Sequence, residues 1–160
     1  MTGLELRAVD RTNIWKLVKL SVSDEQRDFI ATNTESILEA YTTITSGGVA
    51  LPFGIFDGEQ PVGFVMLGYG RLDDDDPSVA DGNYCLWRFM IDKSFQRRGY
   101  GKKALQLTLD YIRTFPRGPA EWCWLSYEPE NEAAKALYHA AGFRETGEIC
   151  GDEAVAVLHL

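Results

Sequence analysis

The stretch FQRRGYGKKA, residues 95–104, concentrates basic side chains and two glycines in a chain whose formal net charge is −8. A helix that begins at such a turn presents unpaired backbone N–H groups and the positive end of its dipole to an anion. Gly99 and Gly101 let a ligand approach the backbone, and counter-charge is available from Arg97, Arg98, Lys102 and Lys103. The pattern predicts a site for a phosphorylated ligand. The alternative, a tight turn before a solvated helix, leaves two lysines opposing the helix dipole by ~0.3–1 kcal/mol each.

Two known phosphate-binding motifs can be compared with this stretch. A Walker A loop requires GxxxxGK[ST], but here one residue separates the glycines and Lys103 follows Lys102, so the match fails. The spacing Gly99-x-Gly101-x-x-Ala104 fits the alanine variant of the dinucleotide fingerprint. That fingerprint normally opens a parallel doubly wound domain, whereas two antiparallel strands are expected before it here. The stretch alone therefore leaves the ligand open.

The elements around this turn follow from hydrophobic periodicity and turn residues. Strands are expected at residues 4–9, 51–56, 62–69, 84–91, 121–127, 143–149 and 154–160. Helices are expected at residues 13–20, between Thr32 and the Gly47-Gly48 pair, and at residues 102–114 and 132–141. Asp57-Gly58 indicates a hairpin, and Thr32 with Glu35 fits a capping box. The polar stretch at residues 70–82, which contains DDDDP, is expected to be a loop.

This order of elements predicts an α/β fold of the α+β type in one domain, residues 1–160. Residues 84–127 form a strand-helix-strand unit, which places two strands parallel in an otherwise antiparallel, mixed sheet. The 160 residues are enough for one hydrophobic core. Exposed terminal strands are compatible with a homodimer.

Composition narrows the class of protein. The excess of 24 acidic over 16 basic residues argues against general nucleic-acid binding and suits a cationic small substrate. No apolar run approaches the ~18 residues of a membrane span, and the first residues lack the layout of a secretory signal, so a cytoplasmic protein is expected. The chain has three cysteines without a CxxC pair and two histidines, which predicts neither a disulfide framework nor a metal site.

Two motifs together resemble the GNAT superfamily of acetyl-CoA-dependent N-acetyltransferases. Gln96-Arg97-Arg98-Gly99-Tyr100-Gly101 is similar to the family's [QR]-x-x-G-x-[GA] pyrophosphate signature. A second signature, N-x-x-A-x-x-x-Y-x-x-x-GF, is matched by Asn131, Ala134, Tyr138 and Gly142-Phe143. The resemblance implies a mostly antiparallel seven-stranded sheet with about four helices, and acetyl-CoA as co-substrate.

The resemblance also implies how acetyl-CoA is bound. The two parallel strands should separate beyond Ile91, so that the pantetheine arm pairs with the backbone of the first strand and the thioester oxygen accepts from Met90 N–H. The pyrophosphate should lie on N–H groups of the glycine turn. The residues implied in cofactor binding are Phe89, Met90, Ile91, Gln96, Arg97, Arg98, Gly99, Tyr100, Gly101, Lys102, Asn131, Ala134 and Tyr138.

Tyr138 is the catalytic residue that the resemblance implies. A phenol of pKa ≈ 10 can protonate the departing CoA thiolate and still be protonated at neutral pH. The alternatives are structural: a helix tyrosine can be a core aromatic, and Asn131 is also a good N-cap for the last helix.

The acceptor is less constrained by the sequence. WRFMID at residues 87–92, the GKK helix start and DEQRDFIA at residues 24–31 look most like the bacterial spermine/spermidine acetyltransferase branch, which implies a polyamine acceptor. A protein N-terminus, a lysine, an antibiotic amine or a noncatalytic CoA-binding module are the alternatives. An alkylammonium must lose a proton before it attacks, and Glu128, Glu130 and Asp81 are candidate bases among which spacing does not select.

Overall fold

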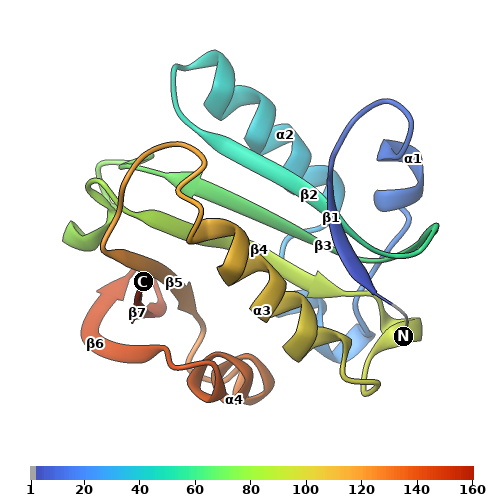
Figure 1. The fold of residues 1–160 in the computed structure, drawn as a ribbon. Coiled ribbons are helices and arrows are strands. Elements are labelled where there is room, and N and C mark those ends of the chain that lie inside the picture. The colour runs from blue at the N-terminus through green and yellow to red at the C-terminus, as the bar shows by residue number, and fades with distance from the viewer. Residues whose placement is uncertain (1–2) are drawn as a thin grey trace.

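The computed structural model describes residues 3–160, which fold around one seven-stranded sheet (Figure 1). The strands are β1 (Leu4–Ala8), β2 (Ala50–Asp57), β3 (Gln60–Tyr69), β4 (Tyr84–Ile91), β5 (Trp122–Tyr127), β6 (Arg144–Cys150) and β7 (Glu153–His159). Their order across the sheet is β1-β2-β3-β4-β5-β7-β6. Every neighbouring pair is antiparallel except β4 and β5, which are parallel. The predicted mixed sheet with a central parallel unit is confirmed.

The helices are α1 (Ile14–Leu17), α2 (Asn33–Thr45), α3 (Tyr100–Ile112) and α4 (Glu132–Ala140), with 3-10 turns η1 (Asp24–Phe29), η2 (Ser78–Ala80) and η3 (Lys93–Phe95). The capping box predicted for α2 is present: the Glu35 N–H donates to the Thr32 hydroxyl oxygen at 3.1 Å, and Thr32 N–H donates to the Glu35 carboxylate. Asn131 caps α4 by accepting from the Ala134 N–H at 3.2 Å. Local hydrogen bonding therefore fixes where both helices begin.

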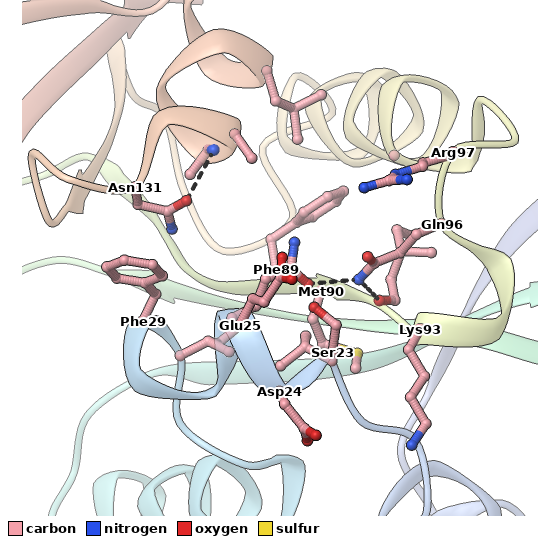
Figure 2. Close-up of a pocket in the computed structure, with 18 of the residues that line it drawn as sticks. Ser23, Asp24, Glu25, Phe29, Phe89, Met90, Lys93, Gln96, Arg97 and Asn131 are labelled. Carbon is pink, nitrogen blue, oxygen red and sulfur yellow. Dashed lines mark hydrogen bonds between the residues drawn. The ribbon is translucent and has the colours of Figure 1, made fainter.

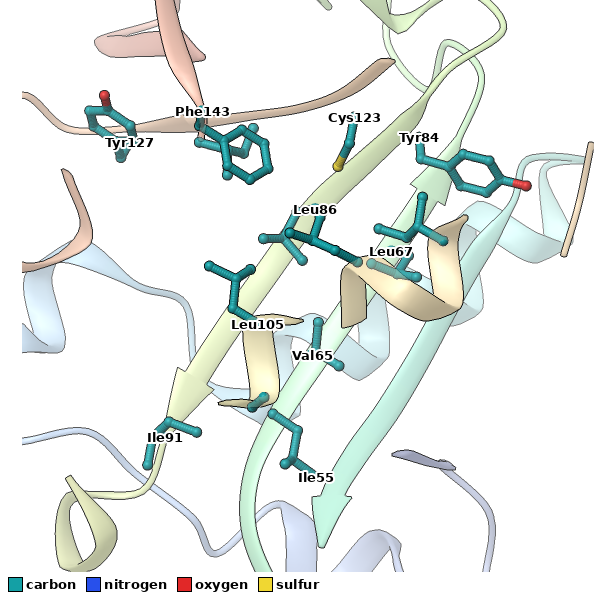
Figure 3. Close-up of a cluster of buried hydrophobic side chains, with 14 of the residues drawn as sticks. Ile55, Val65, Leu67, Tyr84, Leu86, Ile91, Leu105, Cys123, Tyr127 and Phe143 are labelled. Carbon is teal, nitrogen blue, oxygen red and sulfur yellow. The ribbon is translucent and has the colours of Figure 1, made fainter. Parts of the chain in front are cut away.

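The sheet is covered on both faces. On one face α3 packs its apolar stripe, Leu105, Leu109 and Ile112, against β3 and β4, and each of these side chains is at most 1% exposed (Figure 3). On the other face Ala40 of α2 packs near Phe64, Met66 and Met90. Burying a leucine or isoleucine stabilises a fold by ~1.5–3 kcal/mol, so these layers hold the sheet in place. Because β3 is covered on both sides, its residues 62–68 are buried without alternation.

A β-bulge interrupts the pairing of β3 with β4. Met66 pairs with Arg88 and Leu67 with Leu86, so Trp87 has no partner on β3. On its other side β4 pairs with β5 only at Tyr84 with Cys123 and Cys85 with Trp124. The two parallel strands therefore part after Cys85, earlier than the predicted separation beyond Ile91 and next to the bulge at Trp87.

Several predicted boundaries were wrong. Helix α3 begins at Tyr100 rather than residue 102, because Gly99, at φ +82°, already caps it. Helix α1 is one turn rather than residues 13–20, and η1 had no predicted counterpart.

The C-terminal strand β7 lies between β5 and β6, so it is not the exposed edge on which the expected homodimer partly rested. No helix within residues 3–160 is long and apolar enough to cross a membrane.

Candidate active site

Two adjoining cavities open where β4 and β5 separate. The first cavity, about 810 Å³, lies between the chain at residues 22–30, the end of β4, the start of α3 and α4 (Figure 2). The second cavity, about 650 Å³, is lined by residues of η1, β4, β5 and β7. Six residues line both cavities: Phe29, Ile30, Phe89, Asn131, Ala134 and Tyr138. A molecule bound in one cavity would therefore lie against a molecule bound in the other.

The first cavity gathers most of the residues predicted to bind the cofactor. Those that line it are Phe89, Met90, Ile91, Gln96, Arg97, Gly101, Asn131, Ala134 and Tyr138. The opposite wall comes from residues 22–26 with Phe29 and Ile30, which sequence reasoning did not assign to the site. That wall is a loop and a 3-10 turn without a periodic pattern, and the resemblance of residues 24–31 to one branch of the family was its signal in the sequence. The predicted binding roles remain predictions.

The start of α3 has the backbone geometry of an anion site. Gly99 and Arg97 both have positive φ, +82° and +63°, and the first-turn N–H groups of α3 have no acceptor within the helix. A Cβ at Gly101 would meet only ordinary contacts, 3.9 Å from Ile91 and 4.0 Å from Leu137. Packing thus does not require glycine at residue 101. Moreover, glycine inside a helix lowers its stability by ~0.8–1.0 kcal/mol relative to alanine. A ligand that approaches this backbone explains the glycine and fits a pyrophosphate.

Four predicted cofactor residues do not line the first cavity: Arg98, Gly99, Tyr100 and Lys102. The Arg98 guanidinium lies 5.7 Å from the centre of the Phe95 ring. The Tyr100 hydroxyl donates to the Asp57 carboxylate at 2.6 Å and its side chain is buried. These side chains therefore have structural contacts outside the cavity, and a role for the turn's backbone N–H groups remains a prediction.

The Gln96 side chain connects the glycine turn at residues 96–101 to two neighbouring segments. Its side-chain N–H₂ donates to the Ile91 carbonyl oxygen at 2.9 Å and to the Gln26 amide oxygen at 2.8 Å. The first bond ties the turn to the end of β4, and the second ties it to η1 across the first cavity (Figure 2). The first position of the pyrophosphate motif thus shapes the cavity wall.

Tyr138 lies where the two cavities meet. Its ring stacks on Tyr127 at 6.2 Å and meets Phe89 and Phe143 edge-on at 6.5 and 5.9 Å. Burial among these rings raises the pKa of the Tyr138 phenol well above 10, with a smaller contribution from Cys123. Within residues 3–160 its hydroxyl has no hydrogen-bond partner. Tyr138 is therefore protonated at neutral pH and is free to donate.

The second cavity is lined by charged side chains, most of them acidic. Its carboxylates are Asp28, Glu35, Asp76, Glu128 and Glu153, and its guanidinium groups are Arg27 and Arg88. Of the predicted candidate bases only Glu128 lines it; Asp81 pairs with Arg71 at 3.0 Å, and Glu130 lines neither cavity. Two buried donors that line it, Trp124 Nε1 and Arg88 Nε, have no partner within residues 3–160. The cavity therefore offers both negative charge and unused N–H donors.

Comparisons with known proteins identify the family. The model of the acetyltransferase (GNAT) family matches residues 16–143. The chain belongs to the GNAT acetyltransferase family. A probable spermine N(1)-acetyltransferase of Bacillus subtilis subsp. natto (strain BEST195) is 28% identical to it over 92% of this chain and 91% of the relative. The sequence-based assignment to this family is thereby confirmed.

Solved structures share the fold of this GNAT chain. Aminoglycoside acetyltransferase AAC(6')-Ib in complex with coenzyme A superimposes with a TM-score of 0.77 and 15% identity, over 98% of this chain and 95% of that one. Spermidine N-acetyltransferase from Vibrio cholerae, in complex with CoA and spermine, gives a TM-score of 0.66 and 18% identity, over 98% and 94%. At these identities the likeness establishes the architecture alone.

The two buried cysteines of this GNAT chain, Cys85 and Cys123, do not form a nucleophilic centre. Cys85 and Cys123 are buried, and desolvation raises the pKa of Cys123 to about 12 and that of Cys85 well above its ordinary value. Both thiols are thus protonated at neutral pH, and a thiol is a poor nucleophile. Residues 3–160 hold no group of three or more His, Cys, Asp or Glu side chains placed to bind a metal ion.

Proposed function

We propose that this chain transfers the acetyl group of acetyl-CoA to a primary amine, and that the acceptor is a polyamine such as spermidine or spermine. The observation that carries the proposal is the meeting of two cavities at a protonated tyrosine, Tyr138. One cavity has the backbone of an anion site, and the other carries more carboxylates than guanidinium groups. Such a pair suits a polyanionic donor and a cationic acceptor held in contact.

Binding of acetyl-CoA in the first cavity is supported by the backbone on its walls. Phe89, Met90 and Ile91 pair with β3 on one side, and the parting of β4 from β5 leaves their other side without a strand partner. An amide-bearing arm could pair with this free edge. The free N–H groups at the start of α3 would hold the pyrophosphate, with Arg97 beside them. Coenzyme A is present in solved proteins of the same fold.

The residues then have distinct tasks in direct transfer from thioester to amine. Acetyl-CoA supplies an activated acyl group with a thiolate leaving group. The alternation of β4 turns the Met90 N–H toward Phe64 of β3, which corrects the role expected for Met90. A backbone N–H on the free edge of β4 would instead stabilise negative charge on the thioester oxygen, and Tyr138 would give its proton to the sulfur. The raised pKa of Tyr138 keeps that proton in place until the thiolate develops.

A polyamine acceptor is supported by charge and by relatives. The carboxylates of the second cavity outnumber its guanidinium groups, and Arg88 is already paired with Glu39 at 3.0 Å. The Bacillus subtilis relative is a probable spermine acetyltransferase, and the Vibrio cholerae protein is a spermidine acetyltransferase.

An aminoglycoside is the second candidate acceptor, and one observation favours it. The unpartnered donors Trp124 Nε1 and Arg88 Nε would be satisfied by an acceptor that carries oxygen atoms. A polyamine has ammonium groups but no oxygen. An aminoglycoside has both amines and hydroxyl groups, and the aminoglycoside acetyltransferase shares this fold.

A panel of acceptors decides between these candidates. The purified chain is incubated with acetyl-CoA and, in turn, spermidine, spermine, kanamycin, a lysine peptide and a peptide with a free N-terminus. Thiol release is measured and products are identified by mass spectrometry. Acetylated polyamine with the highest kcat/KM is the expected result. Turnover with kanamycin or a peptide alone would replace the polyamine, and acetyl-CoA binding without turnover of any amine would indicate a noncatalytic module.

A further inference from the structure

Hydrogen bonding distinguishes the five carboxylates of the second cavity. Asp76 accepts from the backbone N–H groups of Leu72 and Asp73 at 2.8 and 3.0 Å, so it shapes its own loop. Glu35 accepts from Thr32 in the capping box of α2. Both are therefore committed to structure.

The three remaining carboxylates differ in how firmly they are held. Asp28 is exposed on η1, whereas Glu128 and Glu153 are both half-buried. Among these three side chains, and within residues 3–160, only Glu153 has a hydrogen-bond partner that fixes it: Ser126 Oγ–H donates to Glu153 Oε1 at 2.6 Å. No cation within residues 3–160 pairs with Glu153. It is thus an oriented, partly desolvated carboxylate that lacks a counter-ion.

The position of Glu153 places it in the same cavity as the proton donor. Glu153 opens β7, and its neighbour Ala154 pairs with Tyr127, whose ring stacks on Tyr138. Ser126 lies next to Tyr127 on β5, and Ser126, Glu153 and Tyr138 all line the second cavity. An amine held by Glu153 would therefore lie in the cavity that ends at Tyr138.

We propose that Glu153 is the catalytic base of acetyl transfer and that Ser126 positions it. This inference rests on the proposed function of the chain as an amine acetyltransferase. Ser126 holds one oxygen of the carboxylate, which leaves the other to bind the acceptor ammonium and take its proton. Spacing along the sequence did not point to Glu153, because strand β6 and the turn after it separate Glu153 from the last motif residue, Phe143.

The steps balance in atoms and charge. The ammonium R–NH₃⁺ gives one proton to Glu153, and the freed electron pair forms the C–N bond to the acetyl carbonyl carbon. The C–S bond breaks with its electrons on sulfur, and Tyr138 protonates that sulfur to give the thiol. The amide nitrogen loses its second proton to solvent, and the proton on Glu153 returns through solvent to Tyr138. One proton is released per acetylated amine.

The test is Glu153→Gln, with Asp152→Asn as a matched control that removes one exposed carboxylate from the adjacent turn residue. With the best acceptor of the panel at pH 7, Glu153→Gln should lower kcat/KM roughly 100- to 1000-fold, in the range of general base catalysis. Its rate should recover about tenfold per pH unit toward the amine pKa near 10.4, because only free amine can then react. Calorimetry should show unchanged acetyl-CoA affinity. Asp152→Asn should behave as the wild type.

Further variants separate orientation from proton transfer. Ser126→Ala should cost roughly tenfold in kcat, and Ser126→Thr, which keeps the hydroxyl, should restore most of it. Glu153→Gln with wild-type kcat/KM, or with a uniform loss at every pH, would overturn the proposal. A large loss in Glu128→Gln alone would transfer the role to Glu128. A wild-type chain that binds acetyl-CoA but acetylates no amine would instead show that the proposed function had failed, and the role of Glu153 with it.

Discussion

The two cavities meet at Tyr138 but are built in different ways. The first is formed by three short stretches, residues 22–30, 89–101 and 131–138, and it includes the end of β4 and the start of α3. The second brings together side chains that are far apart in the sequence, including Arg27, Asp76, Ser126 and Glu153. A cavity that binds through backbone needs glycines and turns at fixed spacing, whereas a cavity of side chains can be assembled from any segments that the fold brings together.

Tyr138→Phe tests the point at which the two cavities share a residue, and it should have the largest effect. The variant keeps the ring contacts with Phe89, Tyr127 and Phe143 but loses the proton donor. We expect kcat to fall roughly 100- to 10,000-fold, with little change in acetyl-CoA affinity by calorimetry. Tyr111→Phe on α3, outside both cavities, is the matched control. Wild-type kcat in Tyr138→Phe would assign Tyr138 to packing alone.

Gly101→Ala tests whether the first cavity binds through backbone. The added Cβ meets only ordinary contacts in the protein, and alanine favours helix by up to ~0.8–1.0 kcal/mol over glycine. The variant should therefore melt at a higher temperature while binding acetyl-CoA about 10- to 100-fold more weakly, the equivalent of one lost charge-assisted hydrogen bond. Calorimetric binding and thermal unfolding measure the two effects. Higher stability with unchanged affinity would place the pyrophosphate elsewhere.

The fold was largely predictable because its signals are local. The hairpin at Asp57-Gly58, the capping box of α2 and the N-cap of α4 each lie within a few residues and all are present. Apart from the start of α3, which the local cap at Gly99 decides, the errors fall where tertiary contacts decide. Neither the bulge at Trp87 nor the early parting of β4 from β5 follows from local propensity. The same holds for η1, whose Gln26 is held by a hydrogen bond from a residue 70 positions away.

The candidate site likewise has one part that local sequence signals predict and one part that only tertiary contacts bring together. The residues of the first cavity at 89–101 and 131–138 could be assigned from motifs, whereas its wall at residues 22–30 could not. As candidate bases the sequence pointed to Glu128, Glu130 and Asp81, and not to Glu153, the base that we propose. Whether a carboxylate can act as a base depends on the groups around it. For Glu153 that group is the Ser126 hydroxyl, which lies 27 positions earlier in the sequence. No spacing rule links a strand residue to the far side of a later hairpin. Only the register of β5 with β7 brings the two side chains together.

Tyr127→Phe should have the smallest effect, and it contrasts a structural tyrosine with Tyr138, the proposed proton donor that is stacked on it. The Tyr127 hydroxyl donates to Glu145 at 2.7 Å, and burial, together with that carboxylate, raises the phenol pKa to about 12. Wild-type stability should therefore be full below pH about 10, where an unfolded phenol ionises, and should fall as pH rises toward 12. The variant lacks the hydrogen bond and should be about 1 kcal/mol less stable at pH 8, but the difference should shrink at pH 11. Urea unfolding at both pH values measures it, with Tyr41→Phe, at a position 68% exposed, as the control. A difference that stays constant between pH 8 and 11 would show that ionisation of Tyr127 is not linked to folding.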